Sequence, residues 1–312
     1  MSNKILIAGQ EGMVGGAVYR LFKTKKLNII NCKRKDLDFT SQNLVNKWFK
    51  KHQPDIVVNA AGLVGGIMDN YKFQSDYIYI NTMIGMNIVN ASLKFNVKKL
   101  INLGSSCIYP KNVKQPIKEM SLLSSSLEKT NEGYALSKIV TLKYCQYLKK
   151  KYKKNFISIL PANLYGVGDN FDLESSHVLP ALVKKFVLAK LYNKDKVEVW
   201  GTGKARREFL NVEDLASAIY FLTKKNLSED YINIGSGEDF LIKDLAFLIK
   251  KTIKYKGNIV FNKNYPDGVR LRKTNSSIIK KLGWSPKIRI RDGIKNYCNY
   301  YLNTVLPNEN LF

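Results

Sequence analysis

Tyr134 and Lys138 stand four residues apart in a stretch whose apolar spacing predicts a helix. Residues at this spacing lie one turn apart on the same helix face. A free tyrosine has a pKa of about 10, and a neighbouring ammonium group together with an oxidised nicotinamide would favour its phenolate. Such a tyrosine can exchange a proton with a carbonyl or an alcohol. Ser105, at the end of an upstream apolar run, completes a Ser/Tyr/Lys set.

A glycine-rich segment follows the first apolar run, residues 5–8, and leads into a helical pattern over residues 14–23. Glycines at such a turn let backbone N–H groups approach a pyrophosphate at the start of the helix. A strand before and a helix after are the context that a dinucleotide-binding loop requires. We therefore expect this loop to bind the cofactor through Gly9, Gly12, Met13, Val14 and Gly15.

The second predicted strand ends in Cys32-Lys33-Arg34-Lys35, where an NAD-binding enzyme normally places Asp or Glu against the adenosine ribose. Cations at this point suit the 2′-phosphate of NADP(H), and Arg34 is the expected contact. Glu11, in the glycine loop, opposes this assignment because its carboxylate would repel the same phosphate. The balance of these charges predicts NADP(H) as the cofactor.

Apolar runs and amphipathic helical stretches alternate through most of the 312 residues, which predicts βαβ units. The expected fold is an α/β, Rossmann-type doubly wound parallel sheet with a smaller mixed α/β substrate-binding lobe. We assign residues 1–165, with about 210–236, to an NADP-binding domain, and residues 166–209 and 237–312 to the lobe. Strands are expected at 5–8, 28–32, 56–60, 100–103, 156–160, 197–199, 231–234 and 259–261, and helices at 14–23, 42–51, 77–95, 134–153, 178–191, 241–254 and 292–302.

The chain carries 51 basic and 25 acidic residues, a net charge of +26, and such a surplus attracts polyanions without specificity. A basic scaffold that binds NADP and RNA without catalysis is therefore an alternative to an enzyme. However, the lysines are scattered over expected solvent faces without interleaved aromatic residues. We assign most of this charge to solvated background and expect no nucleic-acid partner.

The composition, 45% apolar and 24% charged, excludes disordered and fibrous classes. No apolar stretch approaches roughly 18 residues, so we expect no membrane span, and the first residues show no signal-peptide pattern. The four cysteines and two histidines lack the spacing of a zinc site or a small disulfide framework, so we expect no metal. These features favour a cytoplasmic protein.

Many further segments, in order along the chain, resemble the extended short-chain dehydrogenases nearly from end to end. Within that family, the resemblance is to epimerase-reductases of GDP-linked 4-keto-6-deoxy sugars. The matching segments are GMVG (12–15), VGGI (64–67), GSSCIYP (104–110), TNE (130–132), NLYG (163–166), DNF (169–171), SHVLPAL (176–182), VWG (199–201), REFL (207–210), PDG (266–268) and LGW (282–284).

The resemblance implies a reaction in two parts. Cys107 acts as the base and His177 as the acid that epimerise C3 and C5 of GDP-4-keto-6-deoxy-D-mannose through enolates. Hydride from NADPH then reaches the C4 keto group while Tyr134 gives the proton, and the product is GDP-L-fucose. A dehydratase of this fold would carry Thr-Asp-Glu where Ser105-Ser106-Cys107 stands. A related GDP-keto sugar, such as one on the route to colitose, is the alternative substrate.

The resemblance also implies the remaining contacts, and a homodimer through the helices at 77–95 and 134–153. Lys185 stands where the family usually has arginine, which exchanges a bidentate fork for a point charge. The implied substrate contacts are Val178, Leu182, Lys185, Trp200, Arg207 and Asp267. The implied cofactor contacts beyond the glycine loop and Arg34 are Leu103, Gly104, Ser105, Ser106, Lys138, Pro161, Asn163, Leu164 and His177.

Overall fold

Six parallel strands form the central sheet of the computed structural model, in the order β2-β1-β3-β4-β5-β9. The structure describes residues 3–265 and 267–309, so Pro266 of the PDG segment and the two ends of the predicted domain ranges lie outside the described residues. The order turns at β1, which lies between β2 and β3, and open α/β sheets bind ligands at the carboxyl ends of the strands beside such a turn. The strands are β1 (Ile5–Ala8), β2 (Ile29–Ile30), β3 (Ile56–Asn59), β4 (Lys99–Leu103), β5 (Asn155–Pro161) and β9 (Tyr231–Ile234).

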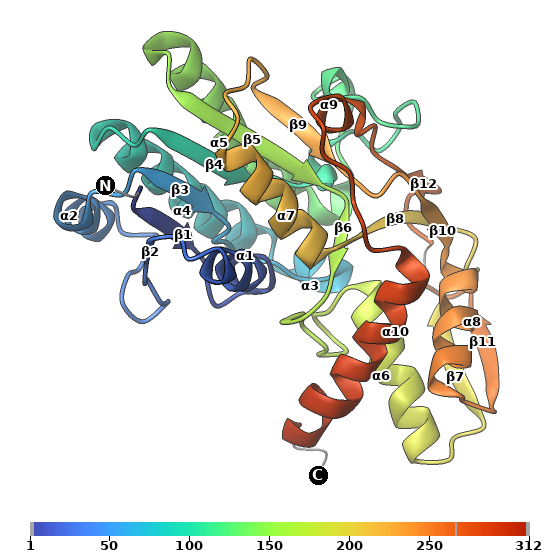
Figure 1. Ribbon diagram of the computed structural model, residues 1–312. Coiled ribbons are helices and arrows are strands. Elements are labelled where there is room, and N and C mark those ends of the chain that lie inside the picture. The colour runs from blue at the N-terminus through green and yellow to red at the C-terminus, as the bar shows by residue number, and fades with distance from the viewer. Residues whose placement is uncertain (1–2, 266, 310–312) are drawn as a thin grey trace.

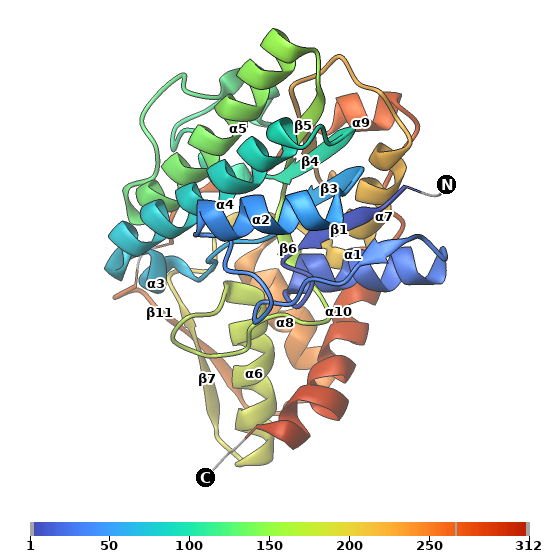
Figure 2. The same ribbon diagram turned by 90° about the vertical axis from the view of Figure 1, so that its left-hand side faces the viewer.

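Helices cover both faces of this sheet, and Figures 1 and 2 show the two layers from perpendicular directions. In β1, Ile5 and Ile7 join one hydrophobic cluster while Leu6 and Ala8 join another, as the two-residue period of a strand requires. The expected doubly wound parallel sheet is confirmed. One face carries α1 (Met13–Thr24) and α7 (Val212–Thr223), and the other carries α2 (Gln42–His52), α4 (Gln74–Lys94) and α5 (Glu132–Tyr152).

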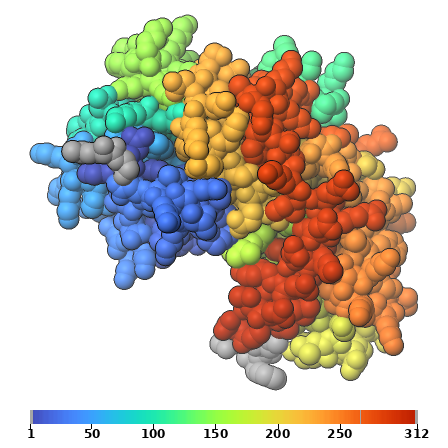
Figure 3. Space-filling view, viewed as in Figure 1, coloured from blue at the N-terminus to red at the C-terminus, as the bar shows by residue number. Residues whose placement is uncertain are grey.

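A second core lies in the lobe, between three helices and a parallel strand pair. Figure 3 shows this lobe projecting from the part of the molecule that holds the sheet. The connection is a small sheet in which β8 pairs with β6, β10 and β12. The elements are α6 (Val178–Leu191), α8 (Ile242–Ile253), α10 (Ile290–Tyr300), β7 (Lys196–Trp200), β11 (Asn258–Asn262), β6 (Asn163–Tyr165), β8 (Arg206–Asn211), β10 (Asp239–Leu241) and β12 (Leu271–Arg272).

Short helical turns complete the described chain. They are α3 (Ile67–Lys72), α9 (Ser277–Lys281), η1 (Ser106–Ile108), η2 (Glu119–Ser121), η3 (Lys129–Asn131), η4 (Tyr301–Val305) and η5 (Leu306–Asn308). Ile279 of α9 and the neighbouring Trp284 pack in the same cluster as α1 and α7, although the sequence assigns their segment to the lobe. The division into two domains with the stated boundaries stays a prediction. No helix in the described ranges is long and apolar enough to cross a membrane.

Several predicted elements have the expected bounds, among them the strands at 5–8 and 231–234 and the helix at 178–191. The prediction for the second strand was wrong in length, because pairing with β1 covers only Ile29 and Ile30. Beyond them the Cys32 N–H donates to Gln10 Oε1 at 3.4 Å instead of continuing the ladder. The sequence analysis did not predict α3, α7, α9 or the strands β6, β8, β10 and β12.

Candidate active site

Ser105, Tyr134 and Lys138 come together where β4 ends and α5 begins. The Ser105 side chain lies close enough to Tyr134 to lower the pKa of its phenol. The ammonium nitrogen of Lys138 lies 5.6 Å from the centroid of the Tyr134 ring and donates to the carbonyl of Leu103 at 3.3 Å. The structure therefore assembles the predicted Ser/Tyr/Lys set, with the two helix residues on one face of α5.

The surroundings of this set are largely desolvated. Lys138 is only 8% exposed, and this burial lowers its pKa to about 8. Burial also raises the pKa of Tyr134, and the nearby Cys107 adds to that increase while the Ser105 side chain opposes it. A positive charge bound beside Tyr134 would therefore have a strong effect on its phenolate, because little water screens it.

Cys107 lies in the η1 turn directly after Ser105, and its N–H donates to Ser105 Oγ at 3.1 Å. All four cysteines carry free thiols, and Cys107 is half-buried whereas the other three are buried. Arg207 is close enough to interact electrostatically with Cys107. Burial lowers the pKa of Arg207 to about 10, and the adjacent Arg272 contributes to that shift. Partial exposure and a cationic neighbour are the setting in which a cysteine thiolate reacts.

His177 is the N-cap residue of α6, and its side chain is exposed on one side, while the protein on the other side desolvates the imidazole and lowers its pKa. The loop at residues 62–66 of the sheet domain lies near Lys138 at one end and near the segment before His177 at the other. A side chain at Gly62 would lie 3.4 Å from the Lys138 nitrogen, and Gly66 N–H donates to the carbonyl of Ser175 at 2.6 Å. The loop at residues 62–66 thus connects the Ser/Tyr/Lys set with the segment that precedes His177.

Two buried groups behind this loop were missed by the sequence analysis. The amide of Asn81, on α4, bonds to both the N–H and the carbonyl of Leu63 at 2.9 and 3.0 Å. Tyr77, one turn earlier, donates to Asp69, and its ring lies edge-on to Tyr134 with centroids 6.2 Å apart. The available signal was polar side chains at helical spacing within an otherwise apolar helix.

The glycine loop has the geometry of a phosphate cradle. Gly9 has φ +83°, and a Cβ there would lie 2.8 Å from the carbonyl oxygen of Ala60. A Cβ at Gly15 would lie 2.0 Å from the Gly9 carbonyl oxygen, and Gly12 N–H donates to that same oxygen at 3.0 Å. Helix α1 begins at Met13 without a side-chain cap, so its first N–H groups are available to an anion. These residues fit a dinucleotide pyrophosphate.

Several of the other predicted cofactor residues lie at or just beyond the carboxyl ends of β4 and β5. Lys138 bonds to the Leu103 carbonyl, as described, and a Cβ at Gly104 would lie 2.5 Å from the side chain of Leu160. The Asn163 side-chain amide donates one hydrogen bond within the protein, to the carbonyl of Glu208 at 2.8 Å. The remaining positions are Val14, Ser106 and Pro161, which are buried, and Met13 and Leu164, which are half-buried.

At the adenosine end, the Glu11 carboxylate accepts the backbone N–H of Arg34 at 2.8 Å. The loop is closed further by Asp36, whose carboxylate accepts the N–H of Lys33 at 2.8 Å. Arg34 is exposed, so its guanidinium is available to a phosphate. Glu11 therefore anchors the loop that carries Arg34, a role that the sequence analysis did not assign to it.

The lobe contributes an aromatic wall with a cation on it. Trp200 is 41% exposed and stacks on Tyr265 with centroids 4.3 Å apart and an interplanar angle of 8°. The Lys185 nitrogen lies 4.9 Å from the Trp200 ring, and burial lowers the pKa of Lys185. Val178 is 39% exposed, whereas Leu182 is 3% exposed and belongs to the lobe core. Tyr265 was not among the predicted residues.

Arg207 and Asp267 are held by their own neighbours. The Asp267 carboxylate accepts the N–H and the hydroxyl of Thr202 at 2.7 and 2.6 Å, which fixes the turn after Trp200. Arg207 donates to the carbonyls of Val269 and Asp267. Over residues 3–265 and 267–309, no group of three or more His, Cys, Asp or Glu side chains could hold a metal ion.

Comparisons with known proteins identify the family of the chain. The family model described as NAD dependent epimerase/dehydratase family matches residues 5–235. The chain is 42% identical over 305 residues to GDP-L-fucose synthase 1 of Arabidopsis thaliana, with 97% of this chain and 94% of the relative covered. It is 39% identical over 303 residues to GDP-L-colitose synthase of Yersinia pseudotuberculosis, with 96% and 98% covered.

A solved structure shares the whole architecture. It is a GDP-L-fucose synthetase from Naegleria fowleri bound to NADP, which is 27% identical, has a TM-score of 0.88, and matches over 97% of this chain and 94% of that chain. The identity to curated relatives extends over both the sheet and the lobe. The chain belongs to the NAD dependent epimerase/dehydratase family, and within that family it is a relative of the GDP-L-fucose synthases.

Proposed function

We propose that the protein converts GDP-4-keto-6-deoxy-D-mannose to GDP-L-fucose, by epimerisation at C3 and C5 and NADPH-dependent reduction at C4. One observation carries this proposal: Ser105 Oγ accepts the backbone N–H of Cys107 at 3.1 Å, and the same side chain lies close enough to Tyr134 to lower the pKa of its phenol. The proposed proton donor for reduction therefore lies beside the turn that carries the proposed base for epimerisation. The names of the curated relatives support the choice of substrate.

The chain's own residues fit NADP(H). The backbone of Gly9, Gly12, Met13, Val14 and Gly15 would hold the pyrophosphate, and the exposed Arg34 would hold the 2′-phosphate. When bound, the cofactor supplies the hydride for C4. The proposed nicotinamide-side contacts are Leu103, Gly104, Ser105, Ser106, Lys138, Pro161, Asn163, Leu164 and His177.

In the epimerase half, the Cys107 thiolate removes the proton from C3, and the electron pair of the C–H bond moves toward the 4-keto oxygen to give an enolate. The His177 imidazolium returns a proton to C3 from the opposite face. Protons exchanged with water reset the thiolate and the imidazolium, and the cycle repeats at C5. The lowered pKa of His177 makes its imidazolium a stronger acid and at the same time reduces the fraction that is protonated near neutral pH.

In the reductase half, Tyr134 gives its proton to the C4 oxygen as hydride reaches the carbon. The Lys138 ammonium, 5.6 Å from the ring centroid, and the Ser105 hydroxyl stabilise the phenolate that remains. Lys185 and Arg207 neutralise the substrate diphosphate, while Trp200 forms a wall for the nucleotide. Val178 and Asp267 complete the proposed substrate contacts, and Leu182 supports them from the lobe core.

Turnover in deuterated water tests both halves at once. GDP-4-keto-6-deoxy-D-mannose and NADPH are added to the protein, NADPH oxidation is followed, and the product is identified by NMR. We expect GDP-L-fucose with deuterium at C3 and C5. Cys107→Ser and His177→Gln should each lose deuterium incorporation, while Tyr134→Phe should lose reduction.

Other outcomes assign a different activity. Reduction without exchange would leave a plain 4-keto reductase and remove the roles of Cys107 and His177. Absence of turnover on this sugar, together with turnover on a 3-deoxy analogue, would favour the activity named for the Yersinia relative. Absence of turnover on both, with tight and salt-sensitive binding of RNA, would favour a basic scaffold.

We also propose a cytoplasmic homodimer. Leu136, Val140 and Tyr147 lie at spacings of four and seven on α5, hence on one helix face, and are 36%, 43% and 62% exposed. Ile78 and Tyr79 expose apolar surface on the packed neighbour α4. Light scattering should report a dimer that Val140→Glu converts to a monomer. The four free thiols favour a reducing compartment.

A further inference from the structure

Arg272 is a buried cation bonded to the turn that carries Cys107. Its residue is 9% exposed, and its Nη1 donates to the carbonyls of Ser106 and Tyr109 at 2.9 and 3.3 Å. One carbonyl lies directly before Cys107 and the other lies two residues after it. The guanidinium therefore spans the η1 turn and fixes both of its ends relative to β12.

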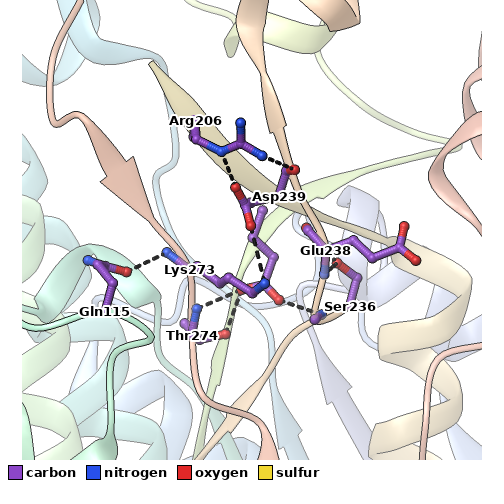
Figure 4. A network of polar contacts seen from close by, with 9 residues as sticks. Gln115, Arg206, Ser236, Glu238, Asp239, Lys273 and Thr274 are labelled. Carbon is purple, nitrogen blue, oxygen red and sulfur yellow. Dashed lines mark hydrogen bonds and ion pairs between the residues drawn. The ribbon is translucent and has the colours of Figure 1, made fainter. Parts of the chain in front are cut away.

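The strand that carries Arg272 is anchored on two sides. Lys273 N–H donates to Gln115 Oε1 at 2.9 Å, and its ammonium bonds to Asp239 at 3.1 Å (Figure 4). Thr274 donates through both its N–H and its hydroxyl to the buried carboxylate of Glu208 at 2.7 Å. These bonds, made by the two residues that directly follow β12, tie the strand to Gln115, Asp239 and Glu208.

Arg272 also lies directly opposite Arg207, the lobe residue proposed to bind the substrate diphosphate, on the neighbouring strand. In the parallel ladder of β12 and β8, Arg272 is the register partner of Arg207. Neither guanidinium has a carboxylate partner among the ion pairs of the described residues. A buried cation without an anion is costly, so such a pair calls for a reason other than stability.

We propose that Arg272 is a positioning residue for the epimerase half of the reaction: it holds the Cys107 turn against β12, next to the strand that binds the substrate diphosphate through Arg207. The inference rests on the proposed role of Cys107 as the base. Arg272 acts through the Ser106 and Tyr109 carbonyls and need not touch the reacting atoms. Its loss should therefore affect proton removal more than hydride transfer.

The test separates the two halves in Arg272→Met. Without NADPH, incorporation of deuterium at C3 and C5 should fall about 10- to 100-fold, the effect of a small displacement of a reacting group. With NADPH, reduction should fall less, and part of the product should be a GDP-linked 6-deoxyhexose without deuterium. Arg270→Met is the matched control, because Arg270 is exposed two residues away on the same segment.

Two further measurements keep the proposal testable. Arg272→Lys retains a charge and a donor, so it should restore part of the exchange rate even if Arg272→Met folds poorly. Alkylation of Cys107 by iodoacetamide, followed by mass spectrometry, reports the turn without any turnover. We expect its rate to change in Arg272→Met and not in Arg270→Met.

The outcomes distinguish this inference from the proposed function. Unchanged exchange in Arg272→Met, or equal losses of exchange and reduction, would overturn the positioning role. If Cys107→Ser itself keeps full exchange, the assignment of the base is wrong. If Cys107→Ser loses exchange while Arg272→Met keeps it, only the role of Arg272 is wrong.

Discussion

The reaction end and the nucleotide end of the candidate site are built differently. At the reaction end, Ser105 follows strand β4 of the central sheet and Tyr134 lies on the covering helix α5, close enough for the Ser105 side chain to lower the pKa of the phenol. At the nucleotide end, Trp200 and Lys185 come from the lobe and meet through ring contacts, with Trp200 41% exposed and Lys138 of the reaction end only 8% exposed. The first end therefore depends on fixed proton positions and the second on open surfaces that a substrate can cover.

This difference predicts that substitutions separate turnover from substrate binding. Changes at the reaction end should lower kcat with little effect on KM, because the hydrogen bonds there act on the transition state. Changes in the lobe should raise KM while the chemistry continues.

Tyr134→Phe should give the largest loss. Removing the phenol removes the proton donor for the C4 oxygen, so reduction should fall about 10²- to 10⁴-fold. NADPH affinity, measured by fluorescence titration, should stay the same, and deuterium exchange at C3 and C5 should persist. Tyr152→Phe, which changes an exposed tyrosine on the last turn of the same helix, is the control. A Tyr134→Phe variant that still reduces the keto sugar would end this assignment.

Arg34→Ala should weaken cofactor binding and leave substrate binding unchanged. A charge-assisted hydrogen bond is worth about 1.5–3 kcal/mol, so NADPH affinity should fall roughly 10- to 100-fold. NADH affinity should hardly change, because NADH lacks the 2′-phosphate. Lys35→Ala, in the same exposed loop, is the control. Equal losses for the two cofactors would show that the side chain supports the loop rather than the phosphate.

The reaction end and the sheet could be predicted from the sequence because their signals are local. Strands buried on both faces read as apolar runs, and Tyr134 and Lys138 are four residues apart. The helix α7 was missed although Asn211 supplies an N-cap signal and accepts the Glu213 N–H at 2.9 Å. That omission was a failure to use a signal that the sequence contains.

The strands that join the lobe to the sheet carry no such local signal. Strand β8 contains Glu208, which is fully buried because Thr274 and Gly237 donate to its carboxylate from distant segments. Likewise, Arg272 bonds to a carbonyl 166 residues away in the chain. A charged residue is predicted to be exposed unless its buried partner can be identified. These partners are distant in the chain, so the pairings could not be predicted from one sequence.

Tyr265→Ala should weaken substrate binding modestly. Tyr265 lies flat against Trp200, and a stacked aromatic pair is worth about 0.5–1.5 kcal/mol, so KM for the GDP-sugar should rise about 2- to 10-fold. Neither kcat nor NADPH affinity should change. Tyr265→Phe keeps the ring and should behave like the unmodified protein. A drop in kcat without a rise in KM would contradict the separation of the two ends.

The smallest effect on turnover is expected at Asp169, in the loop between the two ends. Its carboxylate accepts the Tyr297 hydroxyl at 2.7 Å, and burial raises its pKa from 3.8 to about 6. The native state therefore holds this proton more tightly than the unfolded state. The resulting stabilisation is complete below about pH 4 and is lost as the pH rises through about 6. Asp169→Asn removes this titration while keeping an acceptor for Tyr297.

We therefore expect the Tm difference between Asp169→Asn and the unmodified protein to change by about 2–5 °C between pH 4 and pH 7, in favour of the variant at pH 7. Asp172→Asn is a control of opposite sign, because hydrogen bonds from Ser175 lower the pKa of Asp172. Its carboxylate stabilises the protein above its ordinary pKa, so that variant should lose stability at pH 7 relative to pH 4. Parallel Tm curves for Asp169→Asn and the unmodified protein would show that Asp169 is ionised in the native loop across this range, and the loop would then join the two ends without a proton-dependent contribution.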